Sequence, residues 1–111
     1  MNILTFDDFI FEAAKALTRE ELVAELNKKY PKLNLRDSED FESGYKNCIW
    51  VAGTEDGITA KDEFPLFDYY AEDPQEKRYV FGVHKELGDI LDKAGWYAEW
   101  HDAGTCFLGP I

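Results

Sequence analysis

The strongest constraint on how this chain folds is the uneven placement of its acidic residues. The chain has 111 residues and a formal net charge of -11. Residues 1–36 carry 6 acidic and 6 basic side chains, residues 77–111 carry 5 and 4, and residues 37–76 carry 12 acids against Lys46 and Lys61, a net of -10. Since charged side chains are seldom buried without a partner, the middle segment is expected to lie mostly in loops and at strand ends.

The rest of the composition is that of a folded protein. Hydrophobic residues make up 45% of the chain and aromatic residues 15%, and each large aromatic side chain can bury a large area. A chain of this length buries roughly two-thirds of the surface that its unfolded form exposes. The sequence therefore predicts one compact domain over residues 1–111, with no linker or internal repeat.

Several classes of protein are disfavoured. The acidic residues Asp7 and Asp8 occupy the place of a basic signal-peptide region, and no stretch approaches the roughly 20 apolar residues of a membrane span. A cytoplasmic protein with reduced thiols is expected, although one disulfide between Cys48 and Cys106 is possible. The acidic balance argues against direct binding to nucleic acid.

Metal and cofactor sites are not expected either. The loop from Gly53 to Gly57 has carboxylates beside two glycines, but it lacks the pattern of a calcium-binding EF-hand. The two cysteines and two histidines show no zinc-ligand spacing. No phosphate-binding loop or other catalytic signature is present.

The first thirty residues predict two helices. After Thr5, apolar residues recur at helical spacing, and Thr18 with Glu21 forms a capping box that starts a second helix, which Pro31 ends. The two apolar stripes are Phe6, Phe9, Ile10, Ala13 and Leu17 in the first helix, and Leu22, Val23 and Leu26 in the second.

The middle of the chain predicts strands. Residues 33–45 are open to two interpretations, a loop or a short helical turn capped by Ser38. The apolar run from Cys48 to Ala52 predicts a strand, and a returning strand is expected within 58–70. A third strand is expected over 78–83. Tyr79, Phe81 and Val83 share one side of this strand.

The last thirty residues predict a helix and a hairpin. The helix runs from Val83 to Ala94 and is stopped by Gly95. Trp96 to His101 and Thr105 to Leu108 form the hairpin. The predicted fold is α+β: two N-terminal helices, then an antiparallel sheet of four to five strands with one C-terminal helix inserted before a final β-hairpin, the helices covering one face of the sheet.

The central carboxylates are the first candidate site. We expect them to converge into one anionic platform that docks on a basic partner protein. One form of this docking imitates the charge of a nucleic acid. This predicts an inhibitor of a nucleic-acid-handling enzyme, such as an anti-defence protein of a phage or mobile element. The alternative is a solvated surface that keeps the protein soluble. The candidate residues are Asp37, Glu39, Asp40, Glu42, Glu55, Asp56, Asp62, Glu63, Asp68, Glu72, Asp73 and Glu76.

The C-terminal hairpin is the second candidate, as the site of a small enzyme or ligand-binding domain. Tyr97, Glu99 and His101 alternate along one strand and should point the same way. A histidine beside a carboxylate is suited to act as a general base, and Cys106 could add a nucleophile. The alternative is an exposed Glu99–His101 pair above buried tryptophans.

The aromatic residues between 64 and 81 have two possible places. They fill the core, or they form an exposed patch beside the acidic loops that binds a partner or a second copy of the chain. Two nearby residues carry further expectations: His84 as a surface residue, and Gly88 as a point of close packing within its helix. The aromatic residues are Phe64, Phe67, Tyr69, Tyr70, Tyr79 and Phe81.

Overall fold

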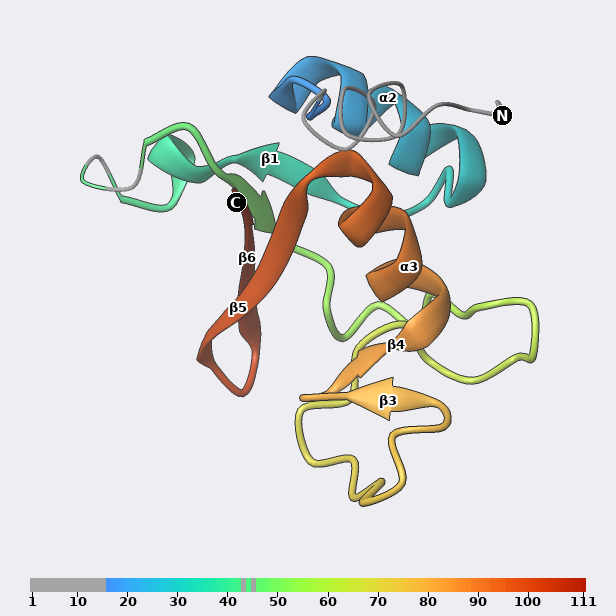
Figure 1. Cartoon of the computed structure of the whole chain (residues 1–111). Helices are drawn as coiled ribbons and strands as arrows, with labels where there is room; N and C mark the ends of the chain where they lie inside the picture. Colours follow the sequence, from blue (N-terminus) through green and yellow to red (C-terminus); the bar gives the residue numbers. More distant parts are fainter. Residues whose placement is uncertain (1–15, 43, 45) are drawn as a thin grey trace, which may run out of the picture.

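The structure is a computed structural model that describes residues 16–42, 44 and 46–111 (Figure 1). The first predicted helix, from Thr5, falls almost entirely outside these residues. The elements in chain order are α2 (Arg19–Lys29), β1 (Leu35–Asp37), the 3-10 turn η1 (Ser38–Asp40), β2 (Ile49–Val51), β3 (Tyr79–Val80), β4 (Val83–His84), α3 (Lys85–Ala94), β5 (Trp96–Asp102) and β6 (Thr105–Pro110).

The main sheet has four antiparallel strands in the order β1-β2-β6-β5. The strands β3 and β4 form a separate two-stranded hairpin. Within the described residues this is an α+β fold with α2, α3 and an antiparallel sheet, which confirms the predicted class. The C-terminal hairpin of β5 and β6 and the helix before it are also where the sequence predicts them.

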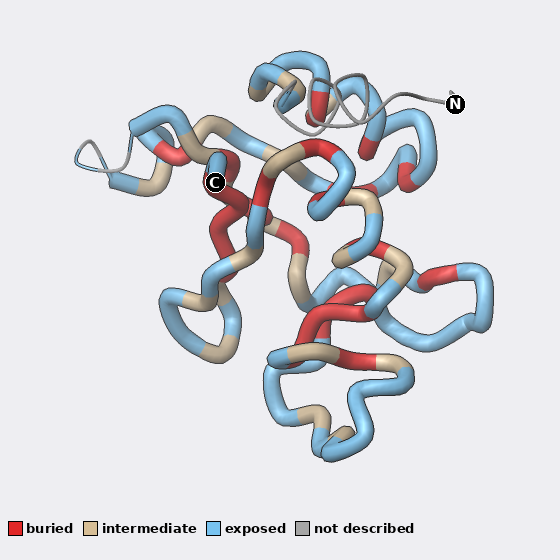
Figure 2. Tube along the Cα trace, in the orientation of Figure 1, coloured by how far each residue is buried: buried red, intermediate tan, exposed pale blue. Residues whose placement is uncertain are grey.

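The core lies between the sheet and the two helices. Leu22 and Leu26 of α2 are fully buried and belong to the same apolar cluster as Leu87 and Leu91 of α3. Figure 2 shows buried positions along β6, with exposed loops around them. The side chains of the main sheet in this cluster are Ile49, Val51, Trp96, Cys106 and Leu108.

Local capping sets the helix ends. The Glu21 amide donates to Thr18 Oγ1 at 3.1 Å, and the Thr18 amide donates to Glu21 Oε1 at 2.9 Å. This is the predicted capping box, and it satisfies amide groups that have no partner within the helix. Gly95 ends α3 with a φ of 78°, a left-handed conformation that glycine adopts without strain.

The predicted returning strand within 58–70 is wrong. This segment makes only isolated bridges, Thr59 with Pro65 and Phe67 with Val83. Strand β2 pairs instead with β1 and β6, so both of its edges are taken. Pro65 has no amide to donate to a ladder, and the acidic residues around it favour a solvated loop. Of the two interpretations of residues 33–45, the short helical turn is close to η1, although Asp37 and not Ser38 is its N-cap. Strand β1 was not predicted, because three residues are too few to show an alternation of apolar and polar side chains.

The predicted strand over 78–83 is also wrong, because a tight turn divides it. Phe81 and Gly82 have φ values of 50° and 76°. Two successive positive φ values are typical of the type I′ turn, the two-residue loop that joins the two strands of a hairpin. Tyr79, Phe81 and Val83 therefore do not share one side: Tyr79 and Val83 are buried, but Phe81 is 87% exposed at the tip.

Candidate partner-binding surface

The twelve candidate carboxylates lie in two groups. All except Asp37 and Asp73 are exposed. Four of them lie in and beside β1 and η1, and eight lie in the loops between β2 and β4. Figure 1 shows η1 and the loops over residues 60–76 on different sides of the molecule, whereas Asp56 lies near Asn34, just before β1. The expected single platform is therefore divided.

Two of the four carboxylates in the smaller acidic group form ion pairs with arginines. Arg19 Nη1 lies 3.1 Å from Asp37 Oδ2, and Arg36 Nη2 lies 3.6 Å from Asp40 Oδ2. Asp37 Oδ1 also accepts the Glu39 amide at 2.9 Å and so caps η1. These carboxylates contribute to local structure, and their field is partly cancelled by the arginines.

The larger group defines a region that we call the acidic lobe, residues 53–84. It has eight acidic side chains against Lys61, Lys77 and Arg78, a net charge of -5 with His84 neutral. Part of the lobe surrounds an open depression of about 620 Å³ lined by Asp62, Asp68, Glu72, Asp73 and others. The eight acidic residues of the lobe are Glu55, Asp56, Asp62, Glu63, Asp68, Glu72, Asp73 and Glu76.

Asp62 and His84 hold the lobe together. His84 Nε2 lies 3.0 Å from both oxygens of Asp62, and Arg78 Nε lies 3.1 Å from Asp62 Oδ2. His84 Nδ1 accepts the Glu86 amide at 3.0 Å and caps α3, so Nε2 carries the proton that Asp62 accepts. His84 is buried rather than on the surface. Because both of its ring nitrogens are engaged, it is a structural residue in this fold.

The environment of these carboxylates lowers their pKa values. Partial loss of water around Asp62 would raise its pKa, but the hydrogen bonds from His84, the Phe64 amide and Arg78 hold it at about 2. Asp73 accepts the amides of Arg78 and Tyr79 at 2.7 and 3.1 Å, and these bonds lower its pKa. The charged carboxylates of Asp62 and Asp73 therefore stabilise the fold of the lobe through these hydrogen bonds.

These shifts predict that the fold weakens in acid. A carboxylate whose pKa is lower in the folded than in the unfolded chain stabilises the fold above its unfolded pKa, near 3.9 for Asp, and this stabilisation is lost as the pH falls. For Asp62 the loss extends from about pH 4 to about pH 2. Urea unfolding at pH 7, 4 and 3 should show a falling midpoint, and Asp62→Asn should reduce the fall. A midpoint that rises down to pH 3 would mean that relief of the net negative charge dominates.

The aromatic residues of the lobe occupy both of the expected places. Phe67 and Tyr79 are buried, whereas Phe64, Tyr69, Tyr70 and Phe81 are exposed, with Tyr70 at 77%. The Tyr69 ring packs edge-on against Tyr70, with centroids 5.2 Å apart, and against Trp100 of β5 at 5.1 Å. The lobe therefore presents aromatic side chains beside its carboxylates.

The turn that presents Phe81 is fixed by its neighbours. Trp100 Nε1 donates to the Phe81 carbonyl at 2.7 Å, and the Asp68 amide donates to the Gly82 carbonyl at 2.8 Å. A Cβ on Gly82 would lie 2.8 Å from the Asp68 carbonyl oxygen, so only glycine fits there. Phe81 itself has a positive φ, which is rare and strained for a bulky residue. Such strain clusters at functional sites.

The sequence placed Phe81 in the aromatic group that could bind a partner, but it predicted neither the turn that presents Phe81 nor the contact with Trp100. The signal was present in Gly82, which stands as the second residue of a two-residue turn between Val80 and Val83. Because the preceding residue is Phe rather than Asn or Asp, the alternating pattern favoured a continuous strand. The hydrogen bond from Trp100 joins residues 19 positions apart, so no local pattern could reveal it.

The hairpin candidate is brought together only in part. Tyr97, Glu99 and His101 line one small hollow of about 140 Å³ on the outer face of the sheet, together with Cys48. The His101 ring contacts Phe41 and Phe107, with centroids 5.3 and 6.1 Å away. Cys106 does not join them. It lies opposite Trp100 and Val51 in the core, on the other face of the sheet.

The two cysteines should differ in reactivity. Cys106 is fully buried, and burial raises its pKa to about 12. Cys48 is partly exposed, and its pKa is raised by burial and by Glu99. Both thiols are free. Since the thiolate is the reactive form, a disulfide reagent should modify one thiol per folded chain, faster at pH 9 than at pH 7, and two in urea. Modification of both thiols in the folded protein at the same rate would contradict these placements.

Comparison of the chain with protein-family models, curated proteins and solved structures found no match. In the part of the chain that the structure describes, no helix has the length and apolar character needed to cross a bilayer. Residues 16–42, 44 and 46–111 also contain no group of three or more His, Cys, Asp or Glu side chains arranged as a metal site.

Proposed function

We propose that this chain is a protein-binding module whose acidic lobe docks on a basic surface of a partner protein. The observation that carries the proposal is the display of Phe81, 87% exposed on a strained turn, within a lobe of net charge -5. Aromatic side chains are enriched at interfaces, and a few residues that fill well-packed pockets carry most of the binding energy. The surrounding carboxylates speed the encounter and exclude acidic partners.

The class of partner follows from the charge. Proteins that bind nucleic acid present clustered Lys and Arg to the phosphate backbone, and such a cluster is complementary to the acidic lobe. In the specific form of the proposal, the chain occupies that surface and inhibits the partner without catalysing a reaction. A phage or mobile-element setting and an anti-defence role remain predictions based on the sequence charge alone.

A matched pair of charge variants tests the proposal. The lobe variant Glu63→Gln/Asp68→Asn/Glu72→Gln/Glu76→Gln removes four exposed carboxylates, and the control variant Glu20→Gln/Glu25→Gln/Glu39→Gln/Glu42→Gln removes four exposed carboxylates outside the lobe. Both change the net charge equally, and both spare Asp62 and Asp73.

The partner is first captured from the native host with the wild-type chain and then purified for calorimetry. Its affinity for the wild-type chain should weaken from low to physiological salt. The lobe variant should bind at least about tenfold more weakly and the control variant within about twofold. A nucleic acid ligand of the partner should compete. Equal weakening in both variants, or affinity that is independent of salt, would refute the role of the lobe.

The second candidate function is that of a small enzyme or ligand-binding domain at the hairpin. The observation that favours it is that Tyr97, Glu99 and His101 line the same hollow as Cys48. It predicts that His101→Ala abolishes function while the lobe variant leaves function intact. The binding module predicts the reverse order of effects, so these two variants separate the candidates.

A further inference from the structure

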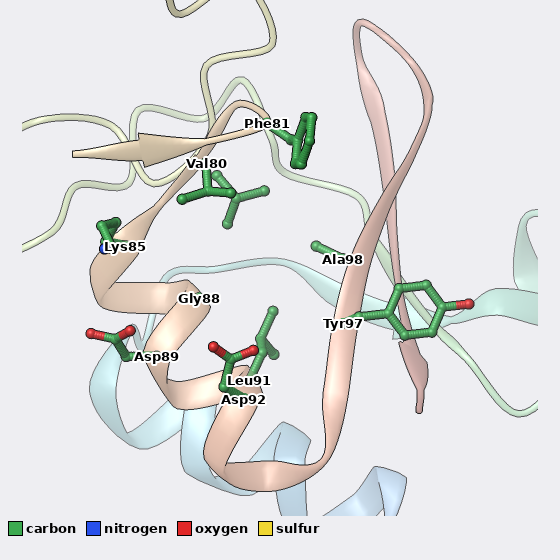
Figure 3. A pocket seen from close by; sticks show the side chains of 10 residues that line it. Val80, Phe81, Lys85, Gly88, Asp89, Leu91, Asp92, Tyr97 and Ala98 are labelled. Atoms are coloured by element: carbon green, nitrogen blue, oxygen red, sulfur yellow. The ribbon is translucent and has the colours of Figure 1, made fainter. Parts of the chain in front are cut away.

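A groove runs between α3 and β5 beside the turn that carries Phe81. Its volume is about 200 Å³. Figure 3 shows Val80 and Leu91 pointing into it, Ala98 on its β5 side and Phe81 over one end, while Tyr97 is directed away. The groove is therefore apolar inside and open to solvent.

Gly88 keeps this groove open. The sequence predicted that Gly88 packs closely against another element, and this is wrong: a Cβ at this position would meet nothing within 4 Å. Glycine is a poorer helix former than alanine, and no neighbouring atom requires it here. Its consequence is a section of α3 without a side chain, which lines the groove.

The size of the groove indicates what it accepts. Pockets for drug-sized molecules have volumes of roughly 300–1,000 Å³, and this groove, at about 200 Å³, is smaller. It has room for a single side chain of a larger partner. Its lining combines apolar side chains with Asp89 and Asp92, against one basic residue, Lys85.

We propose that this groove takes an aliphatic side chain of the partner, from a segment in which that side chain is flanked by Lys or Arg. The apolar floor receives the aliphatic group, and Asp89 and Asp92 attract the flanking cations. The inference rests on the proposed function and extends it. The acidic lobe selects a basic partner, and the groove adds a preference for an aliphatic residue within the partner's basic segment. Val80 and Phe81 join the groove to the acidic lobe, so one basic partner reaches both.

Two synthetic peptides serve as probes, acetyl-Lys-Arg-Leu-Arg-Lys-amide and the same peptide with alanine in place of leucine. They are titrated into the full chain labelled with nitrogen-15, and amide shifts are followed by NMR. Both peptides should shift amides of the acidic lobe. The leucine peptide should also shift Gly88 and Ala98 and should bind about tenfold more tightly, as expected for burial of a larger apolar side chain.

Equal affinity of the two peptides, with Gly88 unmoved, would overturn the groove proposal and leave the acidic lobe standing. Failure of the proposed function would look different, because neither peptide would then give salt-dependent shifts in the lobe.

Variants at Gly88 give an independent measurement. Gly88→Leu places a side chain in the groove and should remove the preference for the leucine peptide, while binding of the alanine peptide stays within about twofold. Gly88→Ala is the matched control. It should fold at least as stably as the wild-type chain and retain the preference. A tenfold preference that persists in a folded Gly88→Leu variant would overturn the proposal.

Discussion

A Phe81→Asn variant should be more stable than the wild-type chain and should bind its partner much more weakly. We expect the free energy of unfolding to rise by about 1 kcal/mol, because a left-handed conformation costs a non-glycine residue roughly 1–2 kcal/mol and Asn tolerates it better. We expect affinity to fall by about thirtyfold, the effect of losing a hot-spot side chain worth about 2 kcal/mol. Urea unfolding and calorimetry measure the two effects.

A rise in stability together with a fall in affinity would separate the role of Phe81 in binding from its role in the fold. At φ 50° and 76°, residues 81 and 82 form a turn for which Asn-Gly is the preferred sequence. Phe is therefore a poor choice for the turn, and its ring is 87% exposed, so it gains little from burial. Because Phe81 weakens the isolated fold without filling the core, we expect it to make its contact outside the chain.

Two controls accompany this prediction. Phe81→Ala removes the ring but keeps a Cβ in the left-handed region, so it should lose affinity without the full gain in stability. Lys93→Gln, an exposed change on α3, should alter neither property by more than about 0.5 kcal/mol. If Phe81→Asn kept full affinity, Phe81 would have no role in binding.

Replacing Trp96 with alanine should strongly destabilise the fold. Trp96 is 2% exposed and belongs to the core cluster, and truncation of a buried Trp to Ala costs about 3–5 kcal/mol. Domains have a total stability of about 5–15 kcal/mol. The variant should therefore unfold at a much lower urea concentration and lose much of its near-ultraviolet circular dichroism.

The indole nitrogen of Trp96 adds a separate contribution. It donates to the Leu17 carbonyl at 2.8 Å, a contact across 79 residues. Trp96→Phe keeps most of the ring and loses this bond, so it should cost less than Trp96→Ala, about 1–3 kcal/mol for an unsatisfied partner and a smaller ring. A loss below about 1 kcal/mol for Trp96→Ala would show that the core does not depend on this side chain.

The features that the sequence predicts correctly are those set by neighbours along the chain. The capping box needs only Thr18 and Glu21, three residues apart. The final hairpin follows from period-two alternation in Trp96 to Trp100 and from the turn after Asp102. Both patterns are local and strong.

The features that the sequence does not predict depend on contacts between residues far apart along the chain. Strand β2 could pair with the segment that follows it, but it pairs with β6, so Trp50 lies opposite Phe107. That choice depends on which strands bury the most surface, and the composition of β2 does not reveal it. Similarly, charge alone identified the acidic residues, but only the fold shows that Asp37 and Asp40 lie apart from the lobe beside arginines.

The junction between β4 and α3 has a consequence for association. His84 is the last residue of β4 and also caps α3, so no connecting loop separates the hairpin from the helix. The position of Phe81 relative to the groove between α3 and β5 is therefore fixed before a partner binds. A partner that contacts Phe81 and the groove together would lose little backbone entropy of this chain on binding. This favours rigid-body association over folding coupled to binding.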